Sequence, residues 1–170
     1  ELVHRGALVA LGYWNDPEKT AERFKPLPGQ RPELVMPEIA VWSGDTVRRD
    51  EEGFLYFVSR RDEMIKTSGY RVSPTEIEEV LYRTALVAEA AAFGVEHPTL
   101  GQAVVVVAQP APGHEPDTDR LLAACRETLP NYMVPARVDW LNEALPRNAN
   151  GKIDRKTLGH ERAGLFGGKA

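Results

Sequence analysis

The chain has 170 residues and a formal net charge of −4, which argues against a nucleic-acid partner because phosphate backbones attract basic surfaces. Its longest apolar stretch, residues 103–108, is far shorter than the roughly 20 residues of a membrane-spanning helix. Cys125 is the only cysteine, so no intramolecular disulfide can form, and we expect a cytoplasmic location.

The N-terminal part begins with a strand-like run at residues 2–10, and the lack of a preceding methionine or helix suggests a fragment. Residues 15–38 are typical of a helix and then a loop. Asn15 or Asp16 can cap the helix, Pro17 suits its first turn, and several later prolines interrupt regular structure. We expect no regular core element in this stretch.

A hairpin is predicted next, at the edge of a sheet. Residues 39–42, 46–48 and 54–58 favour short strands, and the acidic segment 50–53 ends in a glycine that suits a turn. A second hairpin pairs residues 64–66 with 70–72, where Gly69 can adopt the positive φ that a tight turn needs.

A helix comes after the second hairpin. Ser73 suits its N-cap, Pro74 its first position, and Glu76 could complete a capping box with Ser73. We interpret Glu76 and Glu78 as structural residues of this helix.

The remaining elements predict an α+β domain. Residues 86–95 and 103–109 favour strands, and the continuous valine run in the second is typical of a strand covered on both faces. Residues 117–129 form an amphipathic helical pattern, and residues 136–141 favour another strand. From about residue 61 onward we expect a small sheet with helices packed on it.

The densest polar segment is residues 146–155, which contains Gly151-Lys152. A Walker-type phosphate loop would need glycine where Pro146 stands and serine or threonine where Ile153 stands. The segment is therefore not a Walker motif, and taken alone it is better explained as a solvated turn with an exposed lysine.

A charged segment at residues 59–71 surrounds the second hairpin, and alone it could be an edge strand guarded by charge. Together with Trp42-Ser43-Gly44-Asp45 and Asn150-Gly151-Lys152, however, it resembles the adenylate-forming superfamily of acyl-CoA synthetases, peptide-synthetase adenylation domains and luciferases. The N-terminal stretch, through residues 12–20, also resembles the family's segment shortly before the ribose-binding aspartate. The resemblance thus covers nearly the whole chain and is closest to the C-terminal portion of an AMP-forming acyl-CoA ligase.

The resemblance implies two parts. Residues 1–61 would be the incomplete, β-rich end of the large adenylating domain, and residues 62–170 a mobile lid domain with a short mixed or antiparallel sheet and packed helices. Asp62 matches the hinge between them, where a few backbone angles absorb a rotation. We expect roughly the last ten residues to be disordered, as chain termini often are.

The resemblance also implies a reaction in two halves. A carboxylate attacks the α-phosphate of ATP to give an acyl-adenylate and pyrophosphate, and the thiol of coenzyme A then displaces AMP. Asp45 matches the aspartate that accepts the ribose hydroxyls, although it could simply cap a turn. Arg60 matches the arginine beside the ribose, but it comes directly after Ser59, where the family usually has glycine.

Three further residues match family positions in the lid. Gly69 matches the turn that lines the pantetheine tunnel, and Arg71 an arginine that helps hold nucleotide or CoA phosphates. Lys152 matches the catalytic lysine, whose cation stabilises charge on the carboxylate and the α-phosphate during adenylation. The four histidines lack ligand spacing, so we assign no metal site and expect Mg²⁺ to arrive with ATP.

Several alternatives stay open. The loop that grips the outer phosphates of ATP should lie upstream, so we expect the fragment alone to be inactive. The parent could be a free-standing acyl-CoA ligase or a peptide-synthetase adenylation domain, or the chain could be a non-catalytic module that binds CoA or a protein. The acyl substrate cannot be read from these residues. Copies of the chain could also self-associate through the exposed region 1–59.

Overall fold

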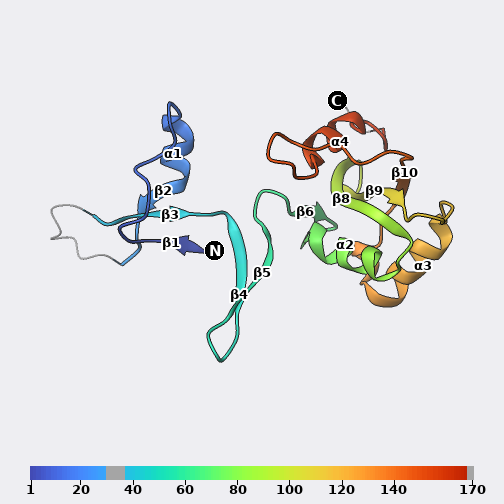
Figure 1. The fold of residues 1–170 in the computed structure, drawn as a ribbon, viewed down its shortest axis with the longest axis horizontal. Helices are drawn as coiled ribbons and strands as arrows, with labels where there is room; N and C mark the ends of the chain where they lie inside the picture. Colours follow the sequence, from blue (N-terminus) through green and yellow to red (C-terminus); the bar gives the residue numbers. More distant parts are fainter. Residues whose placement is uncertain (30–36, 168–170) are drawn as a thin grey trace. The chain divides into compact units, whose positions relative to one another are not determined.

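The computed structural model describes residues 1–29 and 37–167 and divides into two compact units, Glu1–Asp62 and Glu63–Ala170 (Figure 1). Part of the loop expected within 15–38 therefore lies outside the described residues. None of the described helices combines the length and the apolar character that crossing a bilayer requires.

The first unit contains a three-stranded antiparallel sheet in the order β1-β3-β2. Its strands are β1 (Val3–His4), β2 (Phe24–Pro26) and β3 (Ile39–Trp42). Of the two caps considered for helix α1 (Pro17–Arg23), the structure has Asp16, whose side chain accepts a hydrogen bond from the amide of the third helical residue.

Two expectations for this sheet are wrong. The strand expected over residues 2–10 is only two residues long, and Leu8 is fully exposed, so the strand-like run does not form a buried strand. Strand β3 pairs with β1 and β2 rather than joining the next hairpin, while β2 itself, in the stretch where no regular core element was expected, has no buried residue. These pairings join segments far apart in sequence, which local patterns do not reveal.

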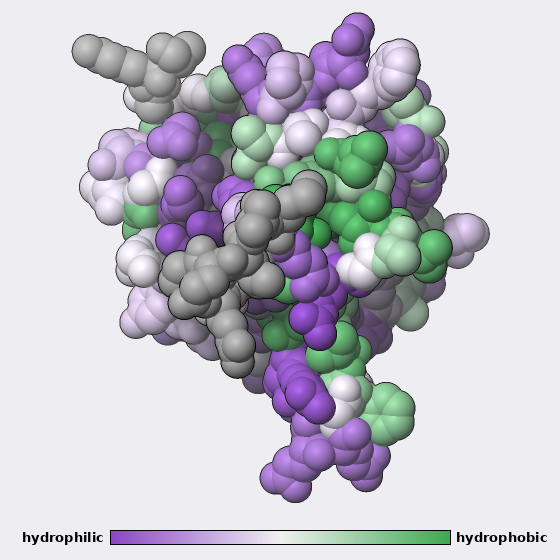
Figure 2. Space-filling model, turned by 90° about the vertical axis from the view of Figure 1, so that its left-hand side faces the viewer, coloured by the Kyte–Doolittle hydropathy of each residue, from purple (hydrophilic) through white to green (hydrophobic). Residues whose placement is uncertain are grey.

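The first predicted hairpin is confirmed as strands β4 (Asp45–Arg49) and β5 (Leu55–Arg60), which pair antiparallel in a sheet of their own. The run from Phe54 to Val58 is between 41% and 61% exposed, and the tip of the hairpin, at the bottom of Figure 2, carries hydrophobic side chains beside hydrophilic ones. Ala40 is the one buried hydrophobic residue among the described residues of this unit. The described part of the first unit therefore has almost no hydrophobic core of its own.

The second unit is built on a mixed sheet in the order β10-β9-β6-β7, with β8 also paired to β9. The second hairpin is confirmed as β6 (Ile65–Thr67) and β7 (Tyr70–Val72). Strands β8 (Val87–His97) and β9 (Gly101–Pro110) form a long antiparallel pair, and β10 (Arg137–Trp140) runs parallel to β9. The α+β class expected from the sequence is confirmed.

Strand β9 carries the core on both of its faces, as its valine run predicted. Val104 and Val106 belong to one buried cluster, and Val105 and Val107 to a second, because side chains alternate across a strand. All four are at most 2% exposed. Burial of each such side chain contributes on the order of 2 kcal/mol.

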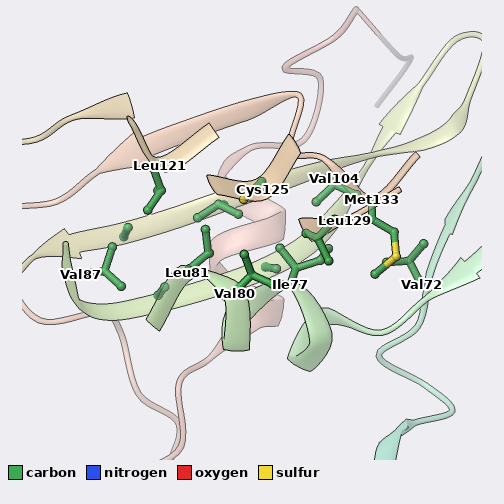
Figure 3. Close-up of a cluster of buried hydrophobic side chains, with 14 of the residues drawn as sticks. Val72, Ile77, Val80, Leu81, Val87, Val104, Leu121, Cys125, Leu129 and Met133 are labelled. Atoms are coloured by element: carbon green, nitrogen blue, oxygen red, sulfur yellow. The ribbon is translucent and has the colours of Figure 1, made fainter. Parts of the chain in front are cut away.

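Helices cover the two faces. Helices α2 (Pro74–Arg83) and α3 (Thr118–Thr128) contribute to the first cluster, in which Leu81 of α2 and Cys125 of α3 are both buried (Figure 3). Leu158 of α4 (Arg155–Glu161) packs in the second cluster. Helix α4 and the short 3₁₀ helix η1 (Asn131–Met133) were not expected from the sequence.

The capping box predicted for α2 does not form. Pro74 occupies the first turn as expected, but the Ser73 side chain makes no capping hydrogen bond, and Ser73 is buried. Helix α3 lies within the range predicted for it, and its N-cap is Asp117, whose Oδ1 accepts a hydrogen bond from the Arg120 amide at 2.9 Å.

The C-terminal segment packs on the second cluster up to Phe166, closer to the chain end than expected. Leu165 and Phe166 lie against the second cluster, and the rings of Phe166 and His97 are 5.1 Å apart. Disorder was expected over roughly the last ten residues. Residues up to 167 instead belong to the described structure, and residues 168–170 lie outside it.

Candidate functional site

The first group of site residues lies on the β4–β5 hairpin. Asp45 and Arg60 are partners in the strand register, which places Arg60 Nη1 at 3.0 Å from Asp45 Oδ1. Arg60 Nε also donates to Asp62 Oδ1 at 3.2 Å, and its Nη2 lies 3.5 Å from the Ser43 carbonyl oxygen. The structure thus brings the three predicted residues of this unit into one charged cluster.

Asp62 has a second basic neighbour, since Arg23 Nη2 lies 3.7 Å from Asp62 Oδ2. Burial opposes ionisation of this carboxyl, but its backbone hydrogen bond and the charges of Arg60 and Arg23 hold its pKa below the usual value. Asp62 also lines an open cleft of about 540 Å³ together with Arg23 and Trp42. The predicted hinge residue therefore keeps its charge and is accessible from this cleft.

The β6–β7 turn carries Gly69. Ser68 and Gly69 have φ values of 50° and 82°, the two positive angles that define the tight turn favoured in two-residue hairpins. A Cβ built on Gly69 would meet nothing within 4 Å, so the turn opens to space. Arg71 pairs with Lys66 in the register and is exposed.

A shallow groove of about 340 Å³ lies beside this turn. Thr67 and Ser68 of the hairpin line one part, and Leu100, Val104 and Tyr132 line another. The ring of Tyr132 also stacks on Tyr70 at a centroid distance of 4.1 Å. Sequence reasoning missed this groove, because its walls come from segments that no local pattern connects.

Lys152 lies at the end of a compact loop. Arg147 and Ile153 form an isolated bridge that closes the loop, and Gly151 has a φ of 76°. The Asn148 side chain accepts hydrogen bonds within the loop, including one from the Lys152 amide at 3.1 Å, and the Asn148 amide donates to the Lys152 carbonyl at 2.8 Å. The backbone of Lys152 is therefore fixed, while the residue is exposed.

An ion pair anchors the chain just after this loop. Both Glu78 carboxylate oxygens accept from Arg155 Nη2, at 2.8 and 2.9 Å, and Glu78 Oε1 also accepts from the Ala92 amide at 2.8 Å. Burial raises the pKa of the Glu78 carboxyl, against the opposing effects of Arg155 and of that amide. The sequence indicated only that Glu78 is structural. Its partner is 77 positions away, so spacing gave no signal.

The predicted residues fall into separate groups. Asp45, Arg60 and Asp62 belong to the first unit, whereas Gly69 and Arg71 on one hairpin and Lys152 on another loop belong to the second. Across residues 1–29 and 37–167, no group of three or more histidine, cysteine, aspartate or glutamate side chains is arranged to hold a metal ion.

Comparison with known proteins identifies the class. Residues 76–152 match the family described as AMP-binding enzyme C-terminal domain. This segment runs from α2 to Lys152 and includes the central sheet strands β8, β9 and β10. The chain therefore carries the C-terminal domain of the AMP-binding, adenylate-forming enzymes, as its motifs indicated.

Individual relatives extend the similarity over most of the chain. The chain is 39% identical to 2-succinylbenzoate–CoA ligase of Geobacillus kaustophilus, covering 93% of this chain and 30% of that protein. It is 38% identical to the long-chain-fatty-acid–CoA ligase of Salmonella typhimurium, covering 100% and 28%. It is also 39% identical to a linear gramicidin synthase protein of Brevibacillus parabrevis, covering 93% and 2%.

Solved structures agree with this assignment. ATP-bound MatB from Rhodopseudomonas palustris superposes with a TM-score of 0.74 at 28% identity, covering 91% of this chain and 28% of that one. The chain spans less than a third of the length of these two ligases and of MatB, at 28% to 30%.

Proposed function

We propose that the chain is the C-terminal part of an AMP-forming acyl-CoA ligase. Such an enzyme activates a carboxylic acid with ATP and transfers the acyl group to coenzyme A. The observation that carries the proposal is the Lys152 loop, where an exposed ammonium group stands on a backbone that Asn148 fixes, at the end of the matched segment. Ligases among the relatives support the same reaction class.

In the first half-reaction a carboxylate oxygen of the acid bonds to the α-phosphorus of ATP, and pyrophosphate leaves with the electrons of the broken bond. Lys152 acts here as the catalytic residue, because its cation offsets negative charge on the carboxylate and phosphoryl oxygens. Mg²⁺ enters with ATP and supplies additional charge neutralisation when bound. The protein's own contribution is a cation on a rigid turn.

Asp45 and Arg60 bind the ribose side of the nucleotide. The Asp45 carboxylate is an acceptor suited to the two ribose hydroxyls, and the Arg60 hydrogen bond at 3.0 Å orients it. Both side chains are partly exposed, at 26% and 35%, so the pair is accessible to a ligand. Asp62 serves as the hinge between the two units.

In the second half-reaction the CoA sulfur bonds to the acyl carbon, and AMP leaves. Gly69 leaves room for the pantetheine arm, which fits the open space around its absent side chain. The exposed Arg71 guanidinium, two residues further along, is placed to hold phosphate oxygens by charge-assisted hydrogen bonds. The partners are thus a small carboxylic acid, ATP and CoA.

The test is ATP–pyrophosphate exchange by a protein that joins these residues to an N-terminal body. Exchange dependent on a carboxylic acid, and then thioester formation with CoA, is the expected result. The isolated chain of residues 1–170 should release no AMP with acid, ATP and CoA, since no loop for the outer phosphates was found in its sequence. Acid-dependent AMP release by the isolated chain, or no exchange by the joined protein, would contradict the proposal.

A second candidate function is a peptide-synthetase adenylation domain. It is favoured by the 39% and 38% identity to two proteins of the linear gramicidin synthase of Brevibacillus parabrevis. The acceptor distinguishes the two, because an adenylation domain would load a carrier protein and leave free CoA unused. A non-catalytic module would bind CoA or a protein and show no exchange in any joined protein.

A further inference from the structure

Arg147 ties the Lys152 loop to the sheet. Its Nη2 donates to Glu89 Oε1 of β8, and its Nη1 donates to the Gly151 carbonyl at 2.8 Å. The same Glu89 carboxylate accepts the Leu145 amide through Oε2 at 2.8 Å. A carboxylate on β8 therefore holds a guanidinium that in turn holds the peptide immediately before Lys152.

This arrangement differs from a simple solvated turn. The Asn148 bonds shape the loop from within, but they do not connect it to any strand. Arg147 supplies that connection, and β8 is paired along its whole length with the buried β9. The Glu89 side chain is 19% exposed and that of Arg147 is 47% exposed, so the carboxylate end of the ion pair is the less solvated one.

The forked shape of the arginine side chain suits both contacts. The guanidinium presents separate Nη1 and Nη2 groups in a rigid plane, one for Gly151 and one for Glu89. A lysine at this position would offer one ammonium centre on a flexible stem, so it could pair with Glu89 while leaving the Gly151 carbonyl less firmly held.

We propose that Arg147 and Glu89 are positioning residues that set the place of Lys152 for the adenylation half-reaction. The inference rests on the proposed function, because it needs Lys152 to be catalytic. Neither residue is assigned a contact with substrate. A cation stabilises developing charge only when it is correctly placed, and small misplacements of a catalytic group reduce rates by large factors.

The first test measures both half-reactions in the full-length enzyme. Arg147→Ala should lower the kcat of adenylation about 10- to 100-fold, with KM for ATP and acid within about twofold and thioester formation from supplied acyl-adenylate unchanged. Arg147→Lys should fall between wild type and Arg147→Ala. Glu89→Gln should also lower adenylation, because its single amide oxygen can accept from the Leu145 amide or from Arg147 but cannot replace both carboxylate oxygens.

The matched control is Arg83→Ala. It removes an arginine of α2 whose ion pair with Glu79 is exposed on both sides, with side chains 71% and 62% accessible. Both half-reactions should remain at wild-type rates in this variant.

The second test needs no activity and uses residues 1–170. Hydrogen exchange at the Gly151 and Lys152 amides should accelerate about tenfold in Arg147→Ala, because the loop loses its link to β8. Amides of Val105 to Val107 in β9 should keep their protection.

The outcomes separate this inference from the proposed function. Wild-type adenylation by Arg147→Ala, with Lys152→Ala inactive, overturns the positioning role and leaves the proposed function intact. Equal loss of both half-reactions, or loss of protection throughout β9, makes Arg147 a general structural residue and also overturns it. Full adenylation by Lys152→Ala removes the proposed function, and the positioning role fails with it.

Discussion

Asn148 forms hydrogen bonds with both backbone groups of Lys152, its amide and its carbonyl. The Asn148 side-chain oxygen accepts the Lys152 amide at 3.1 Å, and the Asn148 amide donates to the Lys152 carbonyl at 2.8 Å. These bonds use only the backbone of Lys152, and the residue is exposed. A cation that binds a substrate needs such an accessible side chain. A surface lysine in an irregular loop would lose more conformational entropy on binding.

Lys152→Ala in the full-length enzyme should lower adenylation at least about 100-fold, as loss of one electrostatic group in a dry site commonly does. Thioester formation from supplied acyl-adenylate should change less than about twofold, because we assign the lysine to one half-reaction. Pyrophosphate exchange and CoA-dependent AMP release measure the two steps separately. Lys156→Ala is the control, since this nearby exposed lysine has no assigned role. Equal loss in both steps would contradict the assignment.

Gly69→Leu should have the opposite effect, with thioester formation reduced at least about tenfold and pyrophosphate exchange preserved. The Cβ of the added side chain would meet no protein atom within 4 Å, so the leucine would project into the space assigned to pantetheine. Gly113→Leu is a matched control for backbone strain, because Gly113 has a φ of 80° against 82° at Gly69 and is equally uncrowded. Normal thioester synthesis by the Gly69 variant would rule out the role.

Protection from hydrogen exchange should differ between the two units. The first unit buries one hydrophobic side chain among its described residues, Ala40, whereas the second closes two clusters around β9. Amides of residues 1–59 should therefore exchange at least about 100-fold faster than those of Val105 to Val107 in a dilute monomer. Protection that rises with concentration would indicate pairing of copies through the exposed apolar strands. Equal protection of both units in a monomer would disprove the expectation.

Asp139 should support stability at neutral pH but not in acid. Its carboxylate accepts from Arg137 Nε at 2.6 Å and from Arg162 Nε at 2.8 Å, which joins β10 to the residue that ends α4. Burial opposes its ionisation, but these two arginines hold its pKa below the ordinary value of 3.8. The unfolded chain therefore takes up the proton first as pH falls, and the stabilisation is lost below pH 3.8.

Asp139→Asn should accordingly lower the free energy of unfolding by about 2 kcal/mol at neutral pH, as expected for hydrogen bonds to charged groups. The difference between the variant and wild type should shrink as the pH is lowered through the folded-state pKa. Urea unfolding of both proteins at several pH values measures it. A difference that is constant across this range would show that the carboxylate charge is not the cause.

The sequence by itself determined the elements whose signals are local. The valine run predicted β9, Gly69 predicted a tight hairpin, and the amphipathic pattern at residues 117–129 predicted α3. The order of the motifs also predicted the domain family that residues 76–152 match. These features depend on neighbours within a few positions along the chain, so their physical cause is visible in the residues themselves.

The tertiary structure decided which distant groups meet. The pairing of Glu78 with Arg155, and of Glu89 with Arg147, joins residues 77 and 58 positions apart and is set by how α2, β8 and the Lys152 loop pack. Likewise, the apolar run at residues 2–10 gave no long strand, because only two of its residues find a pairing partner. A strand exists only where another segment satisfies its backbone hydrogen bonds, and that depends on the folded chain rather than on local composition.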